Sequence, residues 1–236
     1  MIRVAEIYRY PVKSLLGERL MATRLDPMGI IGDRAWALKD EQRGGLTGAK
    51  RFPALMTMSA RFVREPTPEE RSPDVQIRDQ HGNEFTSGGP DADACFSQAL
   101  GNPVSLWPLL PADNAEHYRR QPDTTGADPR VALREMFARA PDEPLPDVSR
   151  FPPLLATHYT PPGTYFDAFP LLILTRSSLR ALQQRASAAG IDANFDVRRF
   201  RPNLLLESDQ QGFIENAWSG RRLRVGGTVL SLEMAC

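Results

Sequence analysis

The sequence predicts a mainly β fold with some α-helix, and two observations carry that prediction. Residues 1–110 contain several short apolar stretches separated by glycine and proline, such as "MIRVAEIY", "GDRAWALKD" and "LMTMSARFV". Many short strands with this punctuation are typical of a β-barrel or a sandwich. In addition, "DVQIRDQHGNEFT" has apolar positions on both sides of a "QHGN" turn, which predicts a hairpin.

The following segments divide the chain further. Apolar residues in "DADACFSQAL" recur at helical spacing, which predicts a helix over 91–100. Residues 111–164 are rich in Pro, Asp and Thr and predict a long connecting segment, because proline interrupts both ladders and helix interiors. A short helix around "RVALREMFARA" interrupts that segment.

Regular structure is expected again from 165 to 236. Residues 171–174 form an apolar run that predicts a buried strand, and Thr175 is placed to cap a helix that ends at Gly190. Residues 204–206 predict a second buried strand. The stretch "RLRVGGTVLSLEM" predicts a hairpin that turns at its two glycines.

Composition narrows the class of protein. The 236 residues carry 29 acidic and 29 basic side chains, so no basic field indicates a nucleic acid or a membrane surface as partner. No signal peptide and no long apolar run is recognisable, so we expect a cytoplasmic enzyme or binding protein. The two cysteines, Cys95 and Cys236, do not make a disulfide framework, and no zinc-ligand spacing is present.

Lysine is rare in this chain, and one lysine stands in an unusual place. Only Lys13, Lys39 and Lys50 are lysines among the 29 basic residues. Lys13 precedes Ser14 in "RYPVKSLLGE", after a proline that sets the turn, and this pair looks like a small anion site. The alternative is that Lys13 is one more solvated surface charge.

Four stretches share one chemical character, because each brings a polar side chain to the edge of a strand. They are "PVKSLLG" with Lys13, "GIIGDRAW" with Arg34, "FDAFPLLILT" with Asp167, and "RRFRPNLLLE" with Arg201 and Asn203. The arginine fork suits a bidentate phosphate contact, and lysine suits a point contact. If these cations converge, they would hold a phosphorylated ligand, with the Asp and Asn free to read a heterocycle.

A different interpretation remains open for each arginine. Arg34 could form an ion pair with its neighbour Asp33, and Arg201 could form one with Asp196. Spacing in the sequence does not decide between these pairs and a common site.

Read together and in order, "PVKS", "GDRAW" and "FRPN" resemble the MOSC family. More narrowly, the chain resembles family members that have an N-terminal MOSC β-barrel domain, namely the mitochondrial amidoxime-reducing component and its bacterial relatives. The resemblance implies an N-terminal MOSC β-barrel domain over 1–110, the connecting segment over 111–164, and a MOSC β-barrel domain over 165–236 that is incomplete at its C-terminus.

The resemblance also implies a molybdenum cofactor, a molybdopterin in which a pterin dithiolene with a phosphate tail holds the metal. Lys13, Ser14 and Arg34 would grip its phosphate and pterin, and Asp167 and Arg201 would complete the pocket. Asn203 would be a further neighbour. In this family the thiolate that binds molybdenum is the second cysteine of a C-x-R-C segment, and the sequence given stops at the first, Cys236. We therefore assign no metal ligand and no catalytic residue.

Three functions stay open at this point. The resemblance favours an oxidoreductase that reduces small N-hydroxylated substrates with electrons from a ferredoxin- or flavodoxin-like donor. A second possibility is a non-catalytic carrier of molybdenum cofactor or of sulfur for metallocofactor assembly. A third is a β-barrel module that binds some other phosphorylated ligand.

Overall fold

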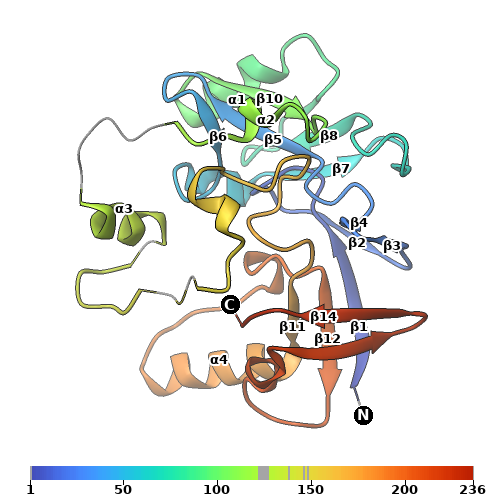
Figure 1. Ribbon diagram of the computed structural model, residues 1–236, viewed down its shortest axis with the longest axis vertical. Coiled ribbons are helices and arrows are strands. Elements are labelled where there is room, and N and C mark those ends of the chain that lie inside the picture. The colour runs from blue at the N-terminus through green and yellow to red at the C-terminus, as the bar shows by residue number, and fades with distance from the viewer. Residues whose placement is uncertain (1, 122–127, 138, 146, 148, 236) are drawn as a thin grey trace.

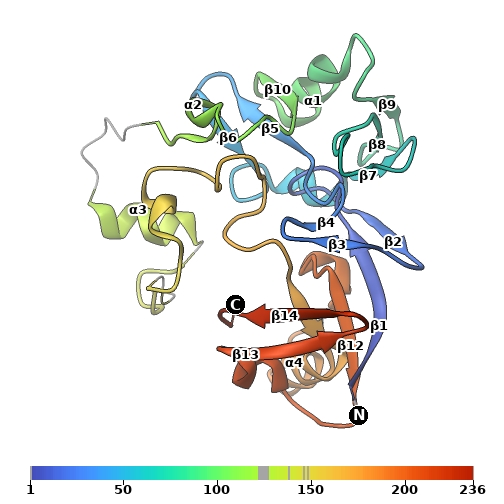
Figure 2. The same ribbon diagram turned by 45° about the vertical axis from the view of Figure 1, so that its right-hand side comes forward.

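The structure is a computed structural model that describes residues 2–121, 128–137, 139–145, 147 and 149–235. Cys236, which the resemblance identifies as the first cysteine of the C-x-R-C segment, lies outside these residues. Figure 1 shows two halves, with the strands β5 to β10 in the upper half and β11 to β14 in the lower half. Both termini lie in the lower half, and helix α3 stands out at the side in Figures 1 and 2.

The largest sheet has four strands and joins the two ends of the chain. Its order is β11-β12-β1-β2, in which β1 is antiparallel to both of its neighbours and β11 is parallel to β12. These strands are β1 (Ile2–Arg9), β2 (Glu18–Leu20), β11 (Ile173–Thr175) and β12 (Leu204–Ser208). Figures 1 and 2 show β1 rising from the lower half into the upper half. The first strand of the chain therefore carries its C-terminal loop to the junction of the halves.

Two antiparallel three-stranded sheets build the upper half. One has the order β10-β5-β6, and the other has the order β7-β8-β9. Their strands are β5 (Trp36–Asp40), β6 (Gly45–Thr47), β7 (Ser59–Phe62), β8 (Val75–Arg78), β9 (Glu84–Thr86) and β10 (Val104–Pro108). The predicted "QHGN" hairpin is confirmed as β8 and β9. A two-residue pairing of β3 (Leu25–Asp26) with β4 (Gly29–Ile30) lies beside them.

The predicted helices and the last hairpin are also present. Helix α1 (Ala92–Leu100) buries Ala92 and Phe96, and α4 (Arg176–Ala188) begins where Thr175 accepts a hydrogen bond from the backbone N–H of Ser178. The strands β13 (Arg221–Val225) and β14 (Thr228–Leu232) pair with each other. Shorter helices are α2 (Ala115–Tyr118), α3 (Pro129–Met136), η1 (Pro53–Thr57), η2 (Pro153–Ala156), η3 (Val197–Arg199) and η4 (Ile214–Trp218).

The expected β content is confirmed, but the expected closed barrel is not found. The described residues form five separate sheets, and none of these closes on itself. In the four-stranded sheet, for example, the edge strands β11 and β2 do not pair with each other, and closure of a barrel requires that pairing. The apolar run at 171–174 is a second correction, because β11 starts at Ile173 and is only half-buried. It is an edge strand, and so only one of its sides is paired.

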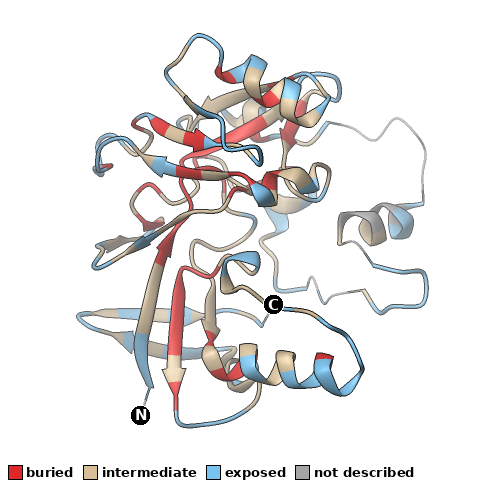
Figure 3. Cartoon of the chain, turned by 180° about the vertical axis from the view of Figure 1, so that it is seen from behind, coloured by how far each residue is buried: buried red, intermediate tan, exposed pale blue. Residues whose placement is uncertain are grey.

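The core lies mainly between the sheets of the upper half. Twelve buried residues form its largest cluster, including Val12, Trp36, Leu55, Ile77 and Phe96. A smaller cluster of Tyr8, Tyr10 and Leu205 ties β1 to β12. Figure 3 shows the buried colour along the central strands, and α4 with buried, intermediate and exposed residues along its length. Because these clusters meet near the loop after β1, that loop has a fixed conformation.

Candidate functional site

Hydrogen bonds between distant segments hold the loop after β1 against the start of β5. The backbone N–H of Arg34 donates to Tyr10 O at 2.7 Å, and the N–H of Lys13 donates to Trp36 O at 2.8 Å. On the other side, the N–H of Tyr8 donates to Asn203 O at 2.8 Å. The predicted stretches "PVKS", "GDRAW" and "FRPN" are therefore neighbours in the fold.

The backbone is left-handed at three predicted site residues. Ser14, Arg34 and Arg201 have φ values of 73°, 49° and 56°, and they are the only non-glycine residues with positive φ in the part of the chain that the structure describes. This conformation costs an L-residue roughly 1–2 kcal/mol. Such strain collects at sites where side-chain placement is needed for function. The three stretches thus share a backbone feature that their sequences do not reveal.

Tyr10 links the two arginines. Its side chain is fully buried, and its hydroxyl donates to Pro202 O at 3.0 Å. The guanidinium carbon of Arg201 lies 4.5 Å from the centre of the Tyr10 ring, and that of Arg34 lies 5.5 Å from it. Both distances are within the range of a cation–π contact. One aromatic ring therefore holds two cations that are far apart in the sequence.

Lys13 interacts electrostatically with Arg34 and Arg201, and it binds Asp167 directly. Its Nζ donates to Asp167 Oδ1 at 2.5 Å and to Tyr165 O at 2.8 Å. Burial lowers the pKa of Lys13, Asp167 opposes that shift, and the charges of Arg34 and Arg201 add to it. In turn, Lys13 holds the pKa of Asp167 well below its ordinary range. The predicted convergence of the three cations is thus found.

Arg201 carries a charge that its surroundings do not balance. Burial and the nearby charge of Arg34 lower the pKa of Arg201 to about 10. Its guanidinium donates to the carbonyl oxygen of Leu15. The alternative pairing with Asp196 is not formed, because Asp196 binds Arg198 at 2.6 Å. A bound anion would therefore relieve a real electrostatic cost at this site.

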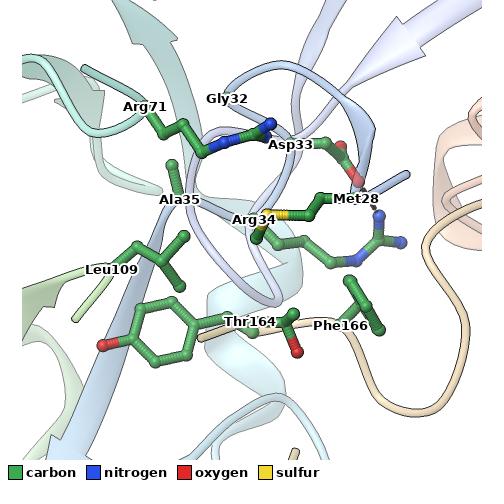
Figure 4. A pocket seen from close by; sticks show the side chains of 10 residues that line it. Met28, Gly32, Asp33, Arg34, Ala35, Arg71, Leu109, Thr164 and Phe166 are labelled. Atoms are coloured by element: carbon green, nitrogen blue, oxygen red, sulfur yellow. Dashed lines mark hydrogen bonds and ion pairs between the residues drawn. The ribbon is translucent and has the colours of Figure 1, made fainter. Parts of the chain in front are cut away.

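The alternative ion pair of Arg34, with Asp33, is also formed, so it does not exclude the grouping of Arg34 with Lys13 and Arg201. The Arg34 guanidinium binds the carboxylate of Asp33, which is 3% exposed. Asp33 also accepts the N–H of Tyr10 at 2.8 Å. Figure 4 shows the Arg34 side chain extending past Met28 toward Asp33, at the wall of a small pocket of about 10 Å³. A pocket of that volume has room for about one water molecule.

Ser14 faces a turn that needs a glycine. Its Oγ accepts the backbone N–H of Ala49 at 2.9 Å. A Cβ at position 48 would lie 2.5 Å from that oxygen, so Gly48 permits the close approach. This contact brings the "GGLTGAKR" turn, and Lys50 within it, to the same region as Lys13.

Asn203 differs from the other five predicted site residues in its surroundings. Its side chain is completely buried and does not line the cavity described below. Its Oδ1 accepts the N–H of Leu172 at 3.0 Å, and its Nδ2 donates to Tyr8 O at 3.3 Å. The same Oδ1 also accepts from Nη1 of Arg34 at 3.4 Å, so the amide binds backbone groups of β1 and of the segment before β11 together with one cation of the site. These contacts position the "FRPN" stretch beside the loop after β1.

A large open cavity receives the other five predicted residues. It has a volume of about 2500 Å³ and lies against both halves of the molecule. Its lining includes Lys13, Ser14, Arg34, Asp167 and Arg201. Asp167 reaches the solvent of this cavity, with 80% of its side chain exposed, whereas Lys13 is 16% exposed. At this part of the cavity wall, the exposed carboxylate of Asp167 therefore lies against the less exposed ammonium group of Lys13.

Sequence reasoning missed three further residues of this region. Tyr10 lies under the arginines, and Lys50 and Arg120 line the cavity. Both additional cations interact electrostatically with Asp167. The rarity of lysine was a usable signal for Lys50, because two of the three lysines of this chain line one cavity. No local signal distinguished Arg120 from the other arginines.

Comparison with known families finds two matching domains in this chain. Residues 1–101 match the MOSC N-terminal beta barrel domain, and residues 158–236 match the MOSC domain. These two matches cover most of the chain, and the chain belongs to the MOSC family. Domains of this family are associated with molybdenum-cofactor sulfurases and with proteins that bind the cofactor. No curated protein matches the chain.

Three further observations concern metals and membranes. Within the described residues, no three His, Cys, Asp or Glu side chains are grouped so that they could hold a metal ion. The described cysteine, Cys95, belongs to α1 and does not line the cavity. None of the described helices has the length and apolar character that crossing a membrane requires.

Proposed function

We propose that this chain binds a molybdenum cofactor in the large cavity and reduces small N-hydroxylated compounds with it. The observation that carries the proposal is that Lys13, Arg34 and Arg201, from three separate loops, line one cavity. The left-handed backbone at Ser14, Arg34 and Arg201 supports it. Family membership supports the choice of cofactor. The reductase activity goes beyond what family membership alone supports.

The residues present fit the organic part of that cofactor. Lys13, Arg34 and Arg201 would hold its phosphate, because they are grouped and one of them carries an unbalanced charge. Asp167 stays ionised at neutral pH and would accept an N–H of the pterin. Tyr10 and Asn203 would hold the cationic loops in place without touching the ligand. We assign no protein ligand to the metal.

The reaction is a two-electron reduction. When bound, the cofactor supplies the redox chemistry by which the N–O bond of the substrate breaks, two electrons and two protons enter, and water leaves. The chain's own residues bind the anionic tail and fix the orientation of the pterin. We propose that a ferredoxin- or flavodoxin-like protein delivers the electrons.

Cofactor content is the first test. Protein purified from cells supplied with molybdate is analysed for molybdenum by elemental analysis and for pterin by fluorescence after oxidation. We expect close to one equivalent of each in the wild type and a loss of roughly tenfold or more in Arg201→Gln. Arg78→Gln is the matched control, because Arg78 is exposed on β8 and does not line the cavity.

Activity is the second test, with benzamidoxime as substrate and a chemical reductant as electron source. Formation of benzamidine by the loaded protein supports the reductase. If the protein binds one equivalent of pterin but forms no benzamidine, the reductase proposal fails and a non-catalytic carrier of the cofactor is favoured. Absence of molybdenum and pterin from the wild type would overturn both, and would leave a module for another phosphorylated ligand.

A further inference from the structure

A second pair of cations faces the same cavity on separate elements. Lys50 follows β6 in the "GGLTGAKR" turn, and Arg120 follows α2. Arg120 is held firmly, because its backbone N–H donates to Thr157 O at 2.8 Å and its Nε donates to Leu155 O at 3.1 Å. Both side chains line the cavity. Neither is part of the group of Lys13, Arg34 and Arg201 around Tyr10.

In the part of the chain that the structure describes, neither cation has a carboxylate within ion-pair distance, although the charge of Asp167 acts on both from farther away. No ion pair involves Lys50 or Arg120 there, whereas the adjacent Arg51 binds Asp40 at 2.6 Å. Arg120 is half-buried, and burial lowers its pKa. A half-buried cation without a counter-ion costs free energy that a bound anion would offset. Lys50 and Arg120 therefore have the properties expected of residues that bind an anion.

Aromatic rings accompany the pair. The guanidinium carbon of Arg120 lies 5.1 Å from the centre of the Tyr159 ring, and Lys50 Nζ lies 4.9 Å from the centre of the Phe137 ring. Phe151 lies beside Phe137, with 6.4 Å between the ring centres. All three rings line the cavity. A planar organic group with an anionic substituent matches this combination of apolar and cationic walls.

We propose that Lys50 and Arg120 form a second oxyanion subsite, which binds a carboxylate or phosphate substituent on the N-hydroxylated substrate. This inference rests on the proposed function for the identity of the substrate. The Arg120 fork suits either oxyanion, and Lys50 adds a point charge. The chain would then prefer anionic aromatic substrates over neutral ones of the same size.

Binding measurements test the subsite directly. Benzamidoxime, 4-carboxybenzamidoxime and 4-phosphonobenzamidoxime are titrated calorimetrically into the oxidised, cofactor-loaded protein, and the ratio of neutral to anionic Kd is the readout. We expect the wild type to prefer an anionic ligand, and Lys50→Gln to reduce that preference by roughly tenfold. Comparison of the two anionic ligands shows which oxyanion is preferred. Steady-state KM values should shift in the same ratio.

Further variants control for misfolding and for the general effect of removing a positive charge. Lys50 is exposed, so Lys50→Gln and the charge reversal Lys50→Glu should fold, and the reversal should disfavour the anionic ligands most. Arg120→Gln tests the half-buried partner. Arg78→Gln makes the same charge change away from the cavity and should leave the preference as it is in the wild type.

The outcomes separate this inference from the proposed function. An equal effect of Lys50→Gln on neutral and anionic ligands overturns the subsite. Loss of pterin from Lys50→Gln also overturns it, because the pair would then hold the phosphate of the cofactor itself. If the wild type contains no pterin, the proposed function fails. Binding of 4-carboxybenzamidoxime to that cofactor-free protein then decides the subsite, which stands only if the binding depends on Lys50.

Discussion

The ammonium group of Lys13 lies 2.5 Å from Oδ1 of Asp167, across 154 positions of the sequence. This ion pair connects the loop after β1 with the segment that precedes β11. It also fixes these two opposite charges at the cavity wall, because Lys13 donates to Tyr165 O at the same time. Four predictions follow from this pair and its surroundings.

The first prediction concerns the carboxylate. Asp167→Asn keeps the shape of the side chain and removes its charge, so Lys13 loses its counter-ion and the pterin loses an acceptor. We expect roughly tenfold less bound pterin, measured by fluorescence after oxidation. Asp113→Asn, an exposed carboxylate outside the cavity, is the control. Pterin content at the wild-type level in Asp167→Asn would show that the ion pair is not part of the binding site.

The second prediction concerns the pH dependence of the stability that Asp167 contributes. The pKa of Asp167 is lower in the folded protein than its ordinary value, mainly because of Lys13. Its ionised form therefore stabilises the fold above the unfolded pKa of about 4, and this contribution is lost as pH falls toward the folded value. We expect the difference in unfolding free energy between the wild type and Asp167→Asn to stay constant from about pH 7 to about pH 5 and to shrink below about pH 4. Urea titrations measure it, and a difference that grows on acidification contradicts the assignment.

The third prediction concerns Tyr10. Tyr10→Phe removes the donor to the buried Pro202 O and should lower the free energy of unfolding by about 1–2 kcal/mol. Tyr10→Leu also removes the ring from Arg34 and Arg201, and should cost about 3 kcal/mol. Only the second change should reduce pterin binding strongly. Equal pterin loss in both variants would mean that the hydroxyl, and not the ring, holds the arginines.

The fourth prediction concerns Asn203. Asn203→Ala leaves the N–H of Leu172 and the carbonyl of Tyr8 without their side-chain partner, so we expect a loss of about 2–4 kcal/mol in the free energy of unfolding. Urea unfolding measures the loss. Asn114→Ala, an exposed change without a side-chain cap bond, should stay within about 0.5 kcal/mol of the wild type. A similarly small effect of Asn203→Ala would show that these hydrogen bonds do not stabilise the fold, and would favour contact with the ligand as the role of Asn203.

The two hairpins and the capped helix were predictable because their signals are local. The "QHGN" and Gly-Gly turns sit between strands that pair with each other, and Thr175 lies three residues from the N–H that it caps. Closure of a barrel was not predictable in the same way. It depends on pairings between distant strands. Among the described residues, the distant antiparallel pairings of β1 with β12 and of β5 with β10 both build open sheets.

The sequence by itself determined the family and the mainly β class, and it singled out five residues that line one cavity, because turn chemistry and short motifs lie in adjacent positions. Only the tertiary structure decided which partner each side chain takes. It paired Asp196 with Arg198, gave the amide of Asn203 to the backbone, and placed Tyr10 between two arginines. It also brought Lys50 and Arg120 to the cavity. Ion pairs and cation–π contacts depend on distances in space, and a chain sets those distances only when it packs.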